Sequence, residues 1–565
     1  MKELKDHIIG LQLLFNSKWS FRFIISAIIL FSIILRLKGI YWGIPTVDIP
    51  HIPFHPDEAW AMNVLKEFNL EKFNFNMHSA HREGSLSYYI ILTIICFLKA
   101  IGYIHSMPNN IIGITADYSK ILLAGRQVTV FFDILSVVLI YFIIKTITKS
   151  RQAPLIGMFV FAIMPFEIIH SHYMRSHIFA NFFILVVIYL SVLLYENQYN
   201  NKLYFFIGLF SGFATATKYN SIIIVSMPIM IYLGLAINKM KFTKFKFPKA
   251  ILMILRDKRI YLLLLALLLG FFITDPYLFL QFNQAKATLA EQASYTATKE
   301  FSLANIYNLS RLRVYVDHLI PYGTLPFLWL LLYSSTVYLL FRSKLYLVSL
   351  PFIIFLFLFL YPMAKGYVYP DFIRAALLIF PILAILVGIA FDDLYILLKN
   401  PRKKIVVWLL LIVICTPTVL YDWAYVSAME RNDPRIQLYN FFKAKVDINK
   451  PINIALIASD QLNYFLVRPT LDIYNNAIRF DNLEESQLST CNDQYLLFYA
   501  FEASHYSLAN DRLKKFTESG KFEFIQSFEN PIKLNGYIFK FPNNPHDLVY
   551  PFPTIYLLKV INKLH

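Results

Sequence analysis

Long apolar segments with few charges recur along this chain, and they constrain its fold more than any other feature. Examples are FRFIISAIILFSIILRL (21–37), YLLLLALLLGFFI (261–273) and WLLLIVICTPTVL (408–420). A hydrocarbon core about 30 Å thick needs helices of about 20 such residues, because backbone polar groups find no water there. With 57% hydrophobic residues and a mean hydropathy of +0.52, the chain is too apolar for one soluble core. The sequence predicts an all-α polytopic membrane domain of about eleven transmembrane helices.

The net charge of +17 fits the same class of protein. The basic residues concentrate in short segments between apolar runs, as expected of cytoplasmic loops, so we do not expect nucleic-acid binding. The N-terminal segment has no short apolar core followed by a small-residue cleavage site, which predicts a retained first helix and a cytoplasmic N-terminus. Cys96, Cys415 and Cys491 lie far apart, so neither a disulfide framework nor a metal-ligand spacing is visible.

The most basic segments predict the topology. They are the N-terminus, 145–151, 239–259, 342–344 and 399–404, and the positive-inside rule places them all in the cytoplasm. Strict alternation then follows the first span with spans at 120–145, 151–167, 178–196, 203–218, 220–238, 260–275, 323–341, 345–362, 372–396 and 405–420.

The apolar segment 84–106 breaks this alternation if it spans the membrane. We therefore expect it to lie in the interface, although a true span with an inverted loop remains an alternative. The predicted outer segments are loops 42–119, with interfacial helices, 168–177, 276–322 and 363–371, and the region after 420.

We expect two domains: a membrane domain over 1–420 and an extracytoplasmic α/β domain over 421–565. INIALIAS, YLLFYAF, FEFIQSF and GYIFKF are strand-like. Asp433 and Pro434 predict a helix start, and Gly520 predicts a helix end. We find no catalytic constellation in this domain, and its expected role is to cover the membrane domain or help bind an acceptor.

Adjacent carboxylates, Asp57 and Glu58, stand in the first outer loop within FHPDEAW. One explanation is structural, because acids favour the N-terminus of a helix and Pro56 turns the chain. The other is catalytic, with His55 ahead of the acids as an orienting neighbour. The pattern alone leaves both open.

The second outer loop, HSHYMRSH, gathers His170, His172, Arg175 and His177. Such a cluster suits a phosphate through charge-assisted hydrogen bonds, or a metal through imidazoles. It also suits lipid headgroups. Further ionisable residues fall where predicted spans meet the same face: Lys218, Asp275, Lys365 and Arg374. Snorkelling explains any one of them, but their convergence on one face makes them candidate site residues.

Several segments resemble the polytopic glycosyltransferases of the GT-C fold, which take sugars from polyprenyl-phosphate carriers. FHPDEAWAMNVLKEF is similar to their acidic motif, and GSLSYYI, with Tyr88, to their juxtamembrane segment. MPFEIIHSHYMRSHIFANFF, GLFSGFATATKYN and ITDPYLFL, with Asp275, are similar to further segments of protein O-mannosyltransferases and aminoarabinose transferases (families 39 and 83). Oligosaccharyltransferases are more distant, and they carry acidic metal ligands where this chain has a His/Arg-rich loop, which puts a divalent metal in doubt.

The resemblance implies transfer of a sugar to an acceptor hydroxyl, with inversion, on the extracytoplasmic face of a cell membrane. Asp57 would be the general base and Glu58 a supporting acid. Arg374 would bind the donor phosphate first, helped by Lys218, Arg175, Lys365 and the three loop histidines. His55, Tyr88 and Asp275 would support them. No cofactor is assigned, and the acceptor, a protein, lipid or glycan, stays open, as does the choice between a bacterium, which we expect, and an archaeon.

Two other classes remain. A transporter or flippase of a lipid-linked or anionic substrate would need internal repeats and ionisable groups near the bilayer midplane, and the sequence shows neither. A non-catalytic membrane scaffold would leave Asp57 replaceable.

Overall fold

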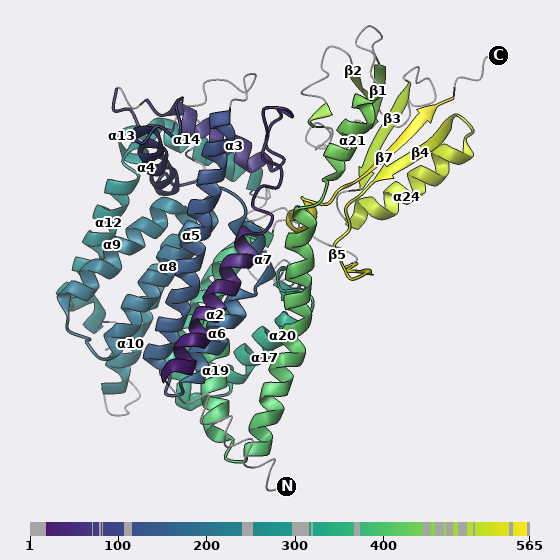
Figure 1. Ribbon diagram of the computed structural model, residues 1–565. Helices are drawn as coiled ribbons and strands as arrows, with labels where there is room; N and C mark the ends of the chain where they lie inside the picture. The colour runs from purple at the N-terminus through teal and green to yellow at the C-terminus, as the bar shows by residue number, and fades with distance from the viewer. Residues whose placement is uncertain are drawn as a thin grey trace.

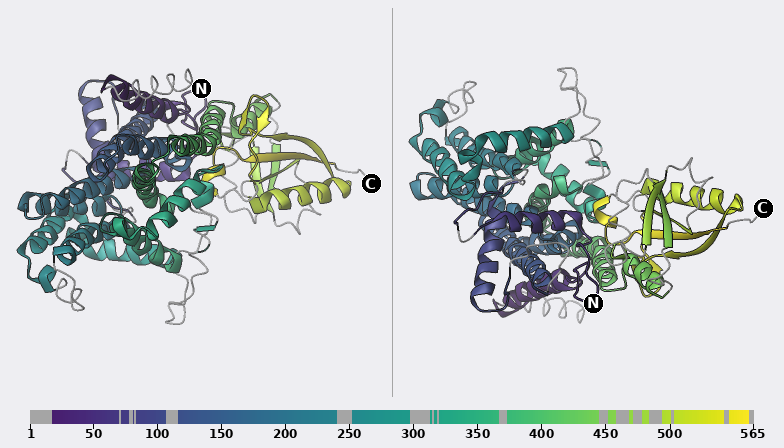
Figure 2. Two further views of the ribbon diagram at one scale, coloured as in Figure 1. Left: turned by 90° about the horizontal axis from the view of Figure 1, so that it is seen from below. Right: turned by 90° about the horizontal axis from the view of Figure 1, so that it is seen from above.

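The structure is a computed structural model that describes residues 18–69, 72–77, 81, 83–106, 116–239, 252–296, 313, 316–317, 320–366, 373–444, 452–457, 468–470, 478–483, 494–500, 503–541 and 546–561. A bundle of helices carries a small mixed sheet domain at one end (Figure 1). Viewed along the bundle, this domain extends to one side (Figure 2).

Helices occupy each range in which the sequence predicts a span. They are α2 (Lys18–Leu37), α5 (Ala116–Ile147), α6 (Gln152–Ala162) with α7 (Pro165–Ser171), α8 (Ser176–Val192), α9 (Asn201–Thr217), η2 (Tyr219–Val225) with α10 (Ser226–Lys239), α12 (Lys258–Thr274), α17 (Leu328–Leu340), α18 (Tyr346–Gly366), η6 (Ile373–Ile379) with α19 (Phe380–Leu397), and α20 (Pro401–Met429).

The expected number of about eleven spans is not confirmed. Within the described residues, six helices are long and apolar enough to cross a membrane, or seven if the bent pair α6 and α7 is one span. Helices α9 and α12 have 17 residues each and α17 has 13, fewer than the about 20 that a full crossing needs. The chain is a multi-pass membrane protein.

The segments predicted to lie outside gather at one end of the bundle. Helices α3 (Pro56–Glu67), α4 (Leu86–Ala100), α13 (Tyr277–Leu280) and α14 (Phe282–Thr296) lie there, at the end that bears the sheet domain (Figure 1). Helix α4 has only 15 residues and lies across the end of the bundle instead of running along it (Figure 1). This placement fits the interfacial interpretation of 84–106.

Glycines bring α9 and α12 into close contact. A Cβ atom at Gly208 would lie 2.1 Å from the carbonyl oxygen of Leu263, and one at Gly212 would lie 2.4 Å from that of Leu267. Small residues of this kind allow helix backbones to approach within a membrane. Because both helices end at the same face, Lys218 and Asp275, their C-cap residues, come into the same region.

The C-terminal region folds as a five-stranded sheet in the order β2-β1-β3-β7-β4. Strands β1 (Ile452–Ile457), β3 (Tyr495–Ala500) and β4 (Phe522–Phe528) match the predicted ones, whereas β2 (Ile478–Leu483) and β7 (Thr554–Val560) were not predicted. Strand β1 pairs in parallel with β2 and β3, and β7 pairs antiparallel with β3 and β4. GYIFKF contributes instead to a separate hairpin of β5 (Lys533–Leu534) and β6 (Tyr537–Ile538).

The helix signals of this region are confirmed. Asp433 caps α21 (Pro434–Lys443) by accepting a hydrogen bond from the backbone of Arg435, with Pro434 at the first position. Helix α24 (Ala503–Glu518) is followed by Gly520 in a left-handed conformation, with φ of 67°. The expected domain boundary near 420 falls inside α20, which continues to Met429.

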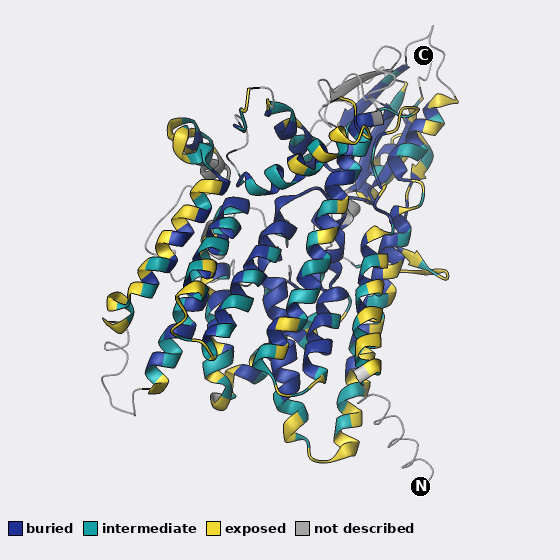
Figure 3. Ribbon diagram, turned by 60° about the vertical axis from the view of Figure 1, so that its left-hand side comes forward, coloured by how far each residue is buried: buried dark blue, intermediate teal, exposed yellow. Residues whose placement is uncertain are grey.

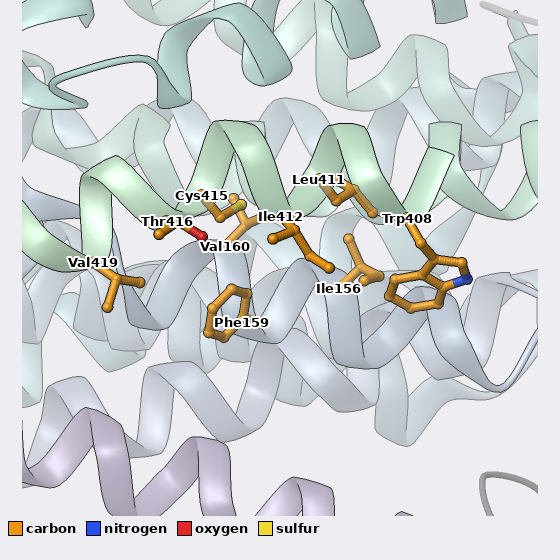
Figure 4. Close-up of a pocket in the computed structure, with 9 residues that line it drawn as sticks. All are labelled: Ile156, Phe159, Val160, Trp408, Leu411, Ile412, Cys415, Thr416 and Val419. Carbon is orange, nitrogen blue, oxygen red and sulfur yellow. The ribbon is translucent and has the colours of Figure 1, made fainter. Parts of the chain in front are cut away.

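An apolar crevice of about 210 Å³ lies between α6 and α20 (Figure 4). Cys415 lines it together with eight other residues, which are Ile156, Phe159, Val160, Trp408, Leu411, Ile412, Thr416 and Val419. Cys96 and Cys415 are free thiols, and Cys491 lies outside the described residues.

Ionisable side chains are buried inside the bundle, which the sequence did not indicate. The Arg36 guanidinium donates to Asp133 Oδ2 at 2.6 Å, to Ser32 Oγ at 2.7 Å and to the Ala162 carbonyl at 2.9 Å. Glu167 accepts both of its hydrogen bonds from the amide of Asn181. The Arg36 bonds join α2 to α5 and α6, and the Glu167–Asn181 bonds join α7 to α8, so two sets of polar bonds connect helices in an apolar setting.

We expect Arg36→Met to lower the free energy of unfolding in detergent by about 3–5 kcal/mol, because Asp133 is then buried without its partner. Denaturant titration of the purified protein measures this change. The matched double variant Arg36→Met with Asp133→Leu removes both charges and should recover most of the loss. A single variant as stable as the wild type would contradict the role of this ion pair.

Candidate active site

Asp57 lies in the first turn of α3, and the two residues before it start this helix. His55 caps the helix, since its Nδ1 accepts from the Asp57 backbone N–H at 3.2 Å, and Pro56 occupies the first position. The motif therefore does start a helix, with Pro56 and the two acids in its first turn. The Asp57 carboxylate nevertheless faces the site, with a quarter of its side chain exposed.

Two guanidinium groups contact Asp57. Its Oδ2 lies 3.0 Å from Arg175 Nη1 and 3.6 Å from Arg374 Nη2. Arg175 comes from the loop between α7 and α8, and Arg374 from η6. The structure thus brings together three residues that the sequence predicted for one site.

Glu83 joins Arg175 to Lys218. Its Oε1 lies 3.2 Å from Arg175 Nη2 and 3.8 Å from Lys218 Nζ, and its Oε2 accepts from Ser176 Oγ at 2.6 Å. Burial acts to raise the pKa of Glu83, but Arg175, Lys218 and Ser176 outweigh it and lower the pKa below its usual value. Glu83 is therefore held as a carboxylate.

The pKa of Lys218 is shifted from the usual value of a lysine. Burial lowers its pKa to about 8, while the nearby Glu83 carboxylate acts to raise it. Its Nζ also lies 2.7 Å from His177 Nε2. Gly84 makes this arrangement possible, because a Cβ atom there would lie 1.8 Å from the Ala216 carbonyl oxygen at the end of α9.

The C-terminal region completes the site. Asp547, in α25 (His546–Val549), accepts from Arg374 Nη1 at 2.6 Å and from its backbone N–H at 3.0 Å. The Tyr550 ring stacks on His55 at 4.9 Å between centroids. The sequence contains no sign that a residue of this region, Asp547, contacts Arg374.

Glu58 lies behind the site and is fully buried. Its carboxylate accepts from Arg126 Nε at 2.9 Å and Nη2 at 2.6 Å, and from the backbone N–H of Met174 at 2.8 Å. Arg126 also donates to the carbonyl oxygens of Ile40 and Trp42. Glu58 therefore holds the first loop against Met174, the residue next to Arg175. Its carboxylate pairs with Arg126, whereas that of Asp57 contacts Arg175 and Arg374.

The three loop histidines have different surroundings. His177 contacts Lys218 as described above, and the buried His170 ring lies 5.9 Å from the His177 ring. Both ring nitrogens of His172 lie 2.7 Å from backbone carbonyl oxygens, those of Ile168 and Lys38. His172 thus holds the loop against the end of α2, and its predicted phosphate contact gains no support.

The remaining predicted residues are more peripheral. Asp275 accepts from Ser85 Oγ and from the Tyr219 hydroxyl, each at 3.0 Å, and burial raises its pKa to about 6. Tyr88 is buried in α4 against Trp60. Lys365 lies in the last turn of α18, and its side chain lies outside the described residues.

The donor groups of this site do not suit a divalent cation. Among the described residues, no three His, Cys, Asp or Glu side chains converge as a metal site. The carboxylates of Asp57, Glu58, Glu83 and Asp547 each contact an arginine instead. We derive no step through a metal.

Residues 118–256 match the model of a protein family described as dolichyl-phosphate-mannose-protein mannosyltransferase. The predicted resemblance is confirmed over that stretch. The matched residues 118–256 include Arg175 and Lys218. No curated protein matches the chain.

Solved structures with a similar arrangement are distant. The oligosaccharyltransferase of Archaeoglobus fulgidus, tethered with an acceptor peptide, has a TM-score of 0.44 and 12% identity, over 87% of this chain and 70% of that chain. ArnT from Cupriavidus metallidurans, bound to undecaprenyl phosphate, has a TM-score of 0.42 and 9% identity, over 95% and 97%.

We expect Lys218 to react with a small amine-reactive reagent with a midpoint near pH 8, because burial disfavours its charged form. Glu83→Gln should move this midpoint to lower pH, since it removes a charge that raises the pKa of Lys218. Mass spectrometry of labelled peptides across pH measures both, with the exposed Lys514 as a control for the reagent. A midpoint that rises in the variant would contradict this electrostatic arrangement.

Proposed function

We propose that this chain is a membrane glycosyltransferase that moves a sugar from a polyprenyl-phosphate-linked donor to an acceptor hydroxyl on the extracytoplasmic face. The observation that carries this proposal is a partly exposed carboxylate, Asp57, in contact with the guanidinium groups of Arg175 and Arg374. A base and cations for a phosphate leaving group are the two needs of this reaction. The family match over residues 118–256 supports the same reaction class.

The cations receive the donor phosphate. Arg374 lies just ahead of α19, so its planar guanidinium can engage phosphate oxygens while the polyprenyl chain stays in lipid. Arg175 and Lys218 add positive charge, and His177 lies beside Lys218. Negative charge that develops on the leaving phosphate is stabilised by these fixed groups.

Asp57 takes the proton of the acceptor hydroxyl. The acceptor oxygen forms a bond to the anomeric carbon as the bond from that carbon to the phosphate oxygen breaks, and the phosphate leaves on its polyprenyl chain. One displacement of this kind inverts the anomeric centre. When the phosphate draws Arg175 and Arg374 away from Asp57, the carboxylate is released to accept the proton, which couples donor binding to base activation.

One observation favours the transporter alternative. Arg36, Asp133 and Glu167 are ionisable and buried within the bundle, which transporters often require. Arg36 and Asp133 pair with each other, however, and Glu167 accepts from Asn181, so we assign these side chains to contacts between helices. A flippase would move a labelled lipid-linked substrate across liposomes without any sugar transfer.

Asp57→Asn should lower the rate of sugar transfer by about 10²–10⁴-fold, because the amide cannot accept the proton. The measurement is transfer from a panel of radiolabelled polyprenyl-phosphate sugars by the purified protein. Asp48→Asn, in the same loop and exposed, is the matched control and should retain activity. Equal rates for Asp57→Asn and the wild type would remove Asp57 from the mechanism.

Arg374→Lys should weaken donor binding by about 10–100-fold, since the charge is kept but the two-pronged hydrogen bonding is lost. A titration of donor concentration shows this as a higher KM. Arg313→Lys, at an exposed arginine, serves as the control. An unchanged KM for Arg374→Lys would assign the donor phosphate to other cations.

A further inference from the structure

The β5–β6 hairpin is a separate structure within the C-terminal region. It does not belong to the five-stranded sheet, and its turn consists of Asn535 and Gly536 with φ of 47° and 84°. Such Asn-Gly turns with two positive φ angles suit tight two-residue hairpins. The side chain of Tyr537 is 68% exposed and that of Ile538 is 39% exposed, and Lys533 and Lys540 beside them are also exposed. We call residues 535–538 the hairpin tip.

The base of the hairpin is fixed to α20. Phe539 and Phe541 each contact the Tyr421 ring, at 5.7 Å and 5.5 Å between centroids. Arg431 donates to the Pro531 carbonyl oxygen, and Asn530 donates to that of Ala428 at 2.7 Å. The tip therefore has a defined place beside this helix, as Figures 1 and 3 show.

The exposed residues of α20 indicate where the hydrocarbon core of the membrane ends along this helix. Its exposed side is apolar from Leu409 and Leu410 through Ile412 and Val413 to Leu420. Trp423 follows, 38% exposed, with the Lys38 ammonium 5.2 Å from its ring centre. Tryptophan and lysine together are typical of a membrane–water interface.

The hairpin reaches this level of the helix. Tyr421, which contacts its aromatic residues, lies two residues before Trp423, about 3 Å closer to the apolar stretch at the rise of an α-helix. The hairpin base therefore lies at the level where the exposed apolar side of α20 ends, and the exposed tip extends from it beside the helix. Tyrosine with flanking lysines suits the headgroup region, where a ring is amphipathic and an ammonium group stays hydrated.

We propose that the hairpin tip inserts into the lipid–water interface beside α20 and anchors the C-terminal domain to the bilayer. Its partner is the bilayer itself, with Tyr537 and Ile538 among the upper acyl chains and Lys533 and Lys540 at the headgroups. This contact is independent of the proposed glycosyl transfer, because it depends only on the membrane position of α20.

The test replaces Tyr537 with the photoreactive residue p-benzoylphenylalanine in the full chain, reconstituted in nanodiscs of phosphatidylcholine and phosphatidylglycerol. Illumination and intact-mass measurement reveal covalent adducts. Phe524 in β4, 41% exposed, is the matched aromatic position in the same domain and receives the same replacement. We expect about tenfold more lipid adduct at 537 than at 524.

The same replacement at Ile538 guards against a folding defect at 537, and gel filtration checks each variant. Lipid adducts at 537 or 538 in about tenfold excess over those at 524 support the anchor. Lipid adducts of similar yield at 524, no lipid adduct at either tip position, or adducts to a second protein chain overturn it.

Discussion

The ion pair of Glu58 with Arg126 supports most of the candidate site. Both side chains are fully buried, and Arg126 also binds the carbonyl oxygens of Ile40 and Trp42 while Glu58 binds the Met174 backbone. The pair thereby joins the segment after α2, the start of α3, the first third of α5 and the loop that carries Arg175. Loss of either partner leaves a buried charge unpaired, which is costly, so these segments are held in one arrangement. Asp57, next in sequence to Glu58, takes its position from this framework.

The candidate site itself is balanced in charge. Arg175, Arg374 and Lys218 face the carboxylates of Asp57, Glu83 and Asp547. Three cations without these partners would repel one another in a partly buried site. The carboxylates keep the guanidinium groups in place by pairing with them. Lys218 is the weakest cation of the three, because burial lowers its pKa to about 8.

Local patterns in the sequence predict local features of this structure well. The caps at Asp433 and Gly520, the helix start at Pro56 and the positions of the bundle helices follow from composition and spacing. Glu83 and Asp547 were missed because their roles depend on partners far along the chain, Arg175 and Arg374. Glu83 directly precedes the GSLSYYI segment, so its position in the sequence is adjacent to a motif, whereas Asp547 stands beside none. Arg36 and Asp133 lie 97 positions apart, so local sequence patterns do not indicate that they pair.

The C-terminal domain contributes to the site through a rigid connection. The Tyr425 hydroxyl donates to the Leu548 carbonyl oxygen at 3.0 Å, and Arg435 donates to that of Tyr550 at 2.8 Å. Helices α20 and α21 thus fix the segment that follows Asp547, and Asp547 in turn binds Arg374. The Arg374 guanidinium and backbone N–H are therefore held in one orientation by the Asp547 carboxylate. The C-terminal domain is therefore a structural part of the candidate site, because Asp547, which lies 173 residues after Arg374 in the chain, positions the Arg374 guanidinium.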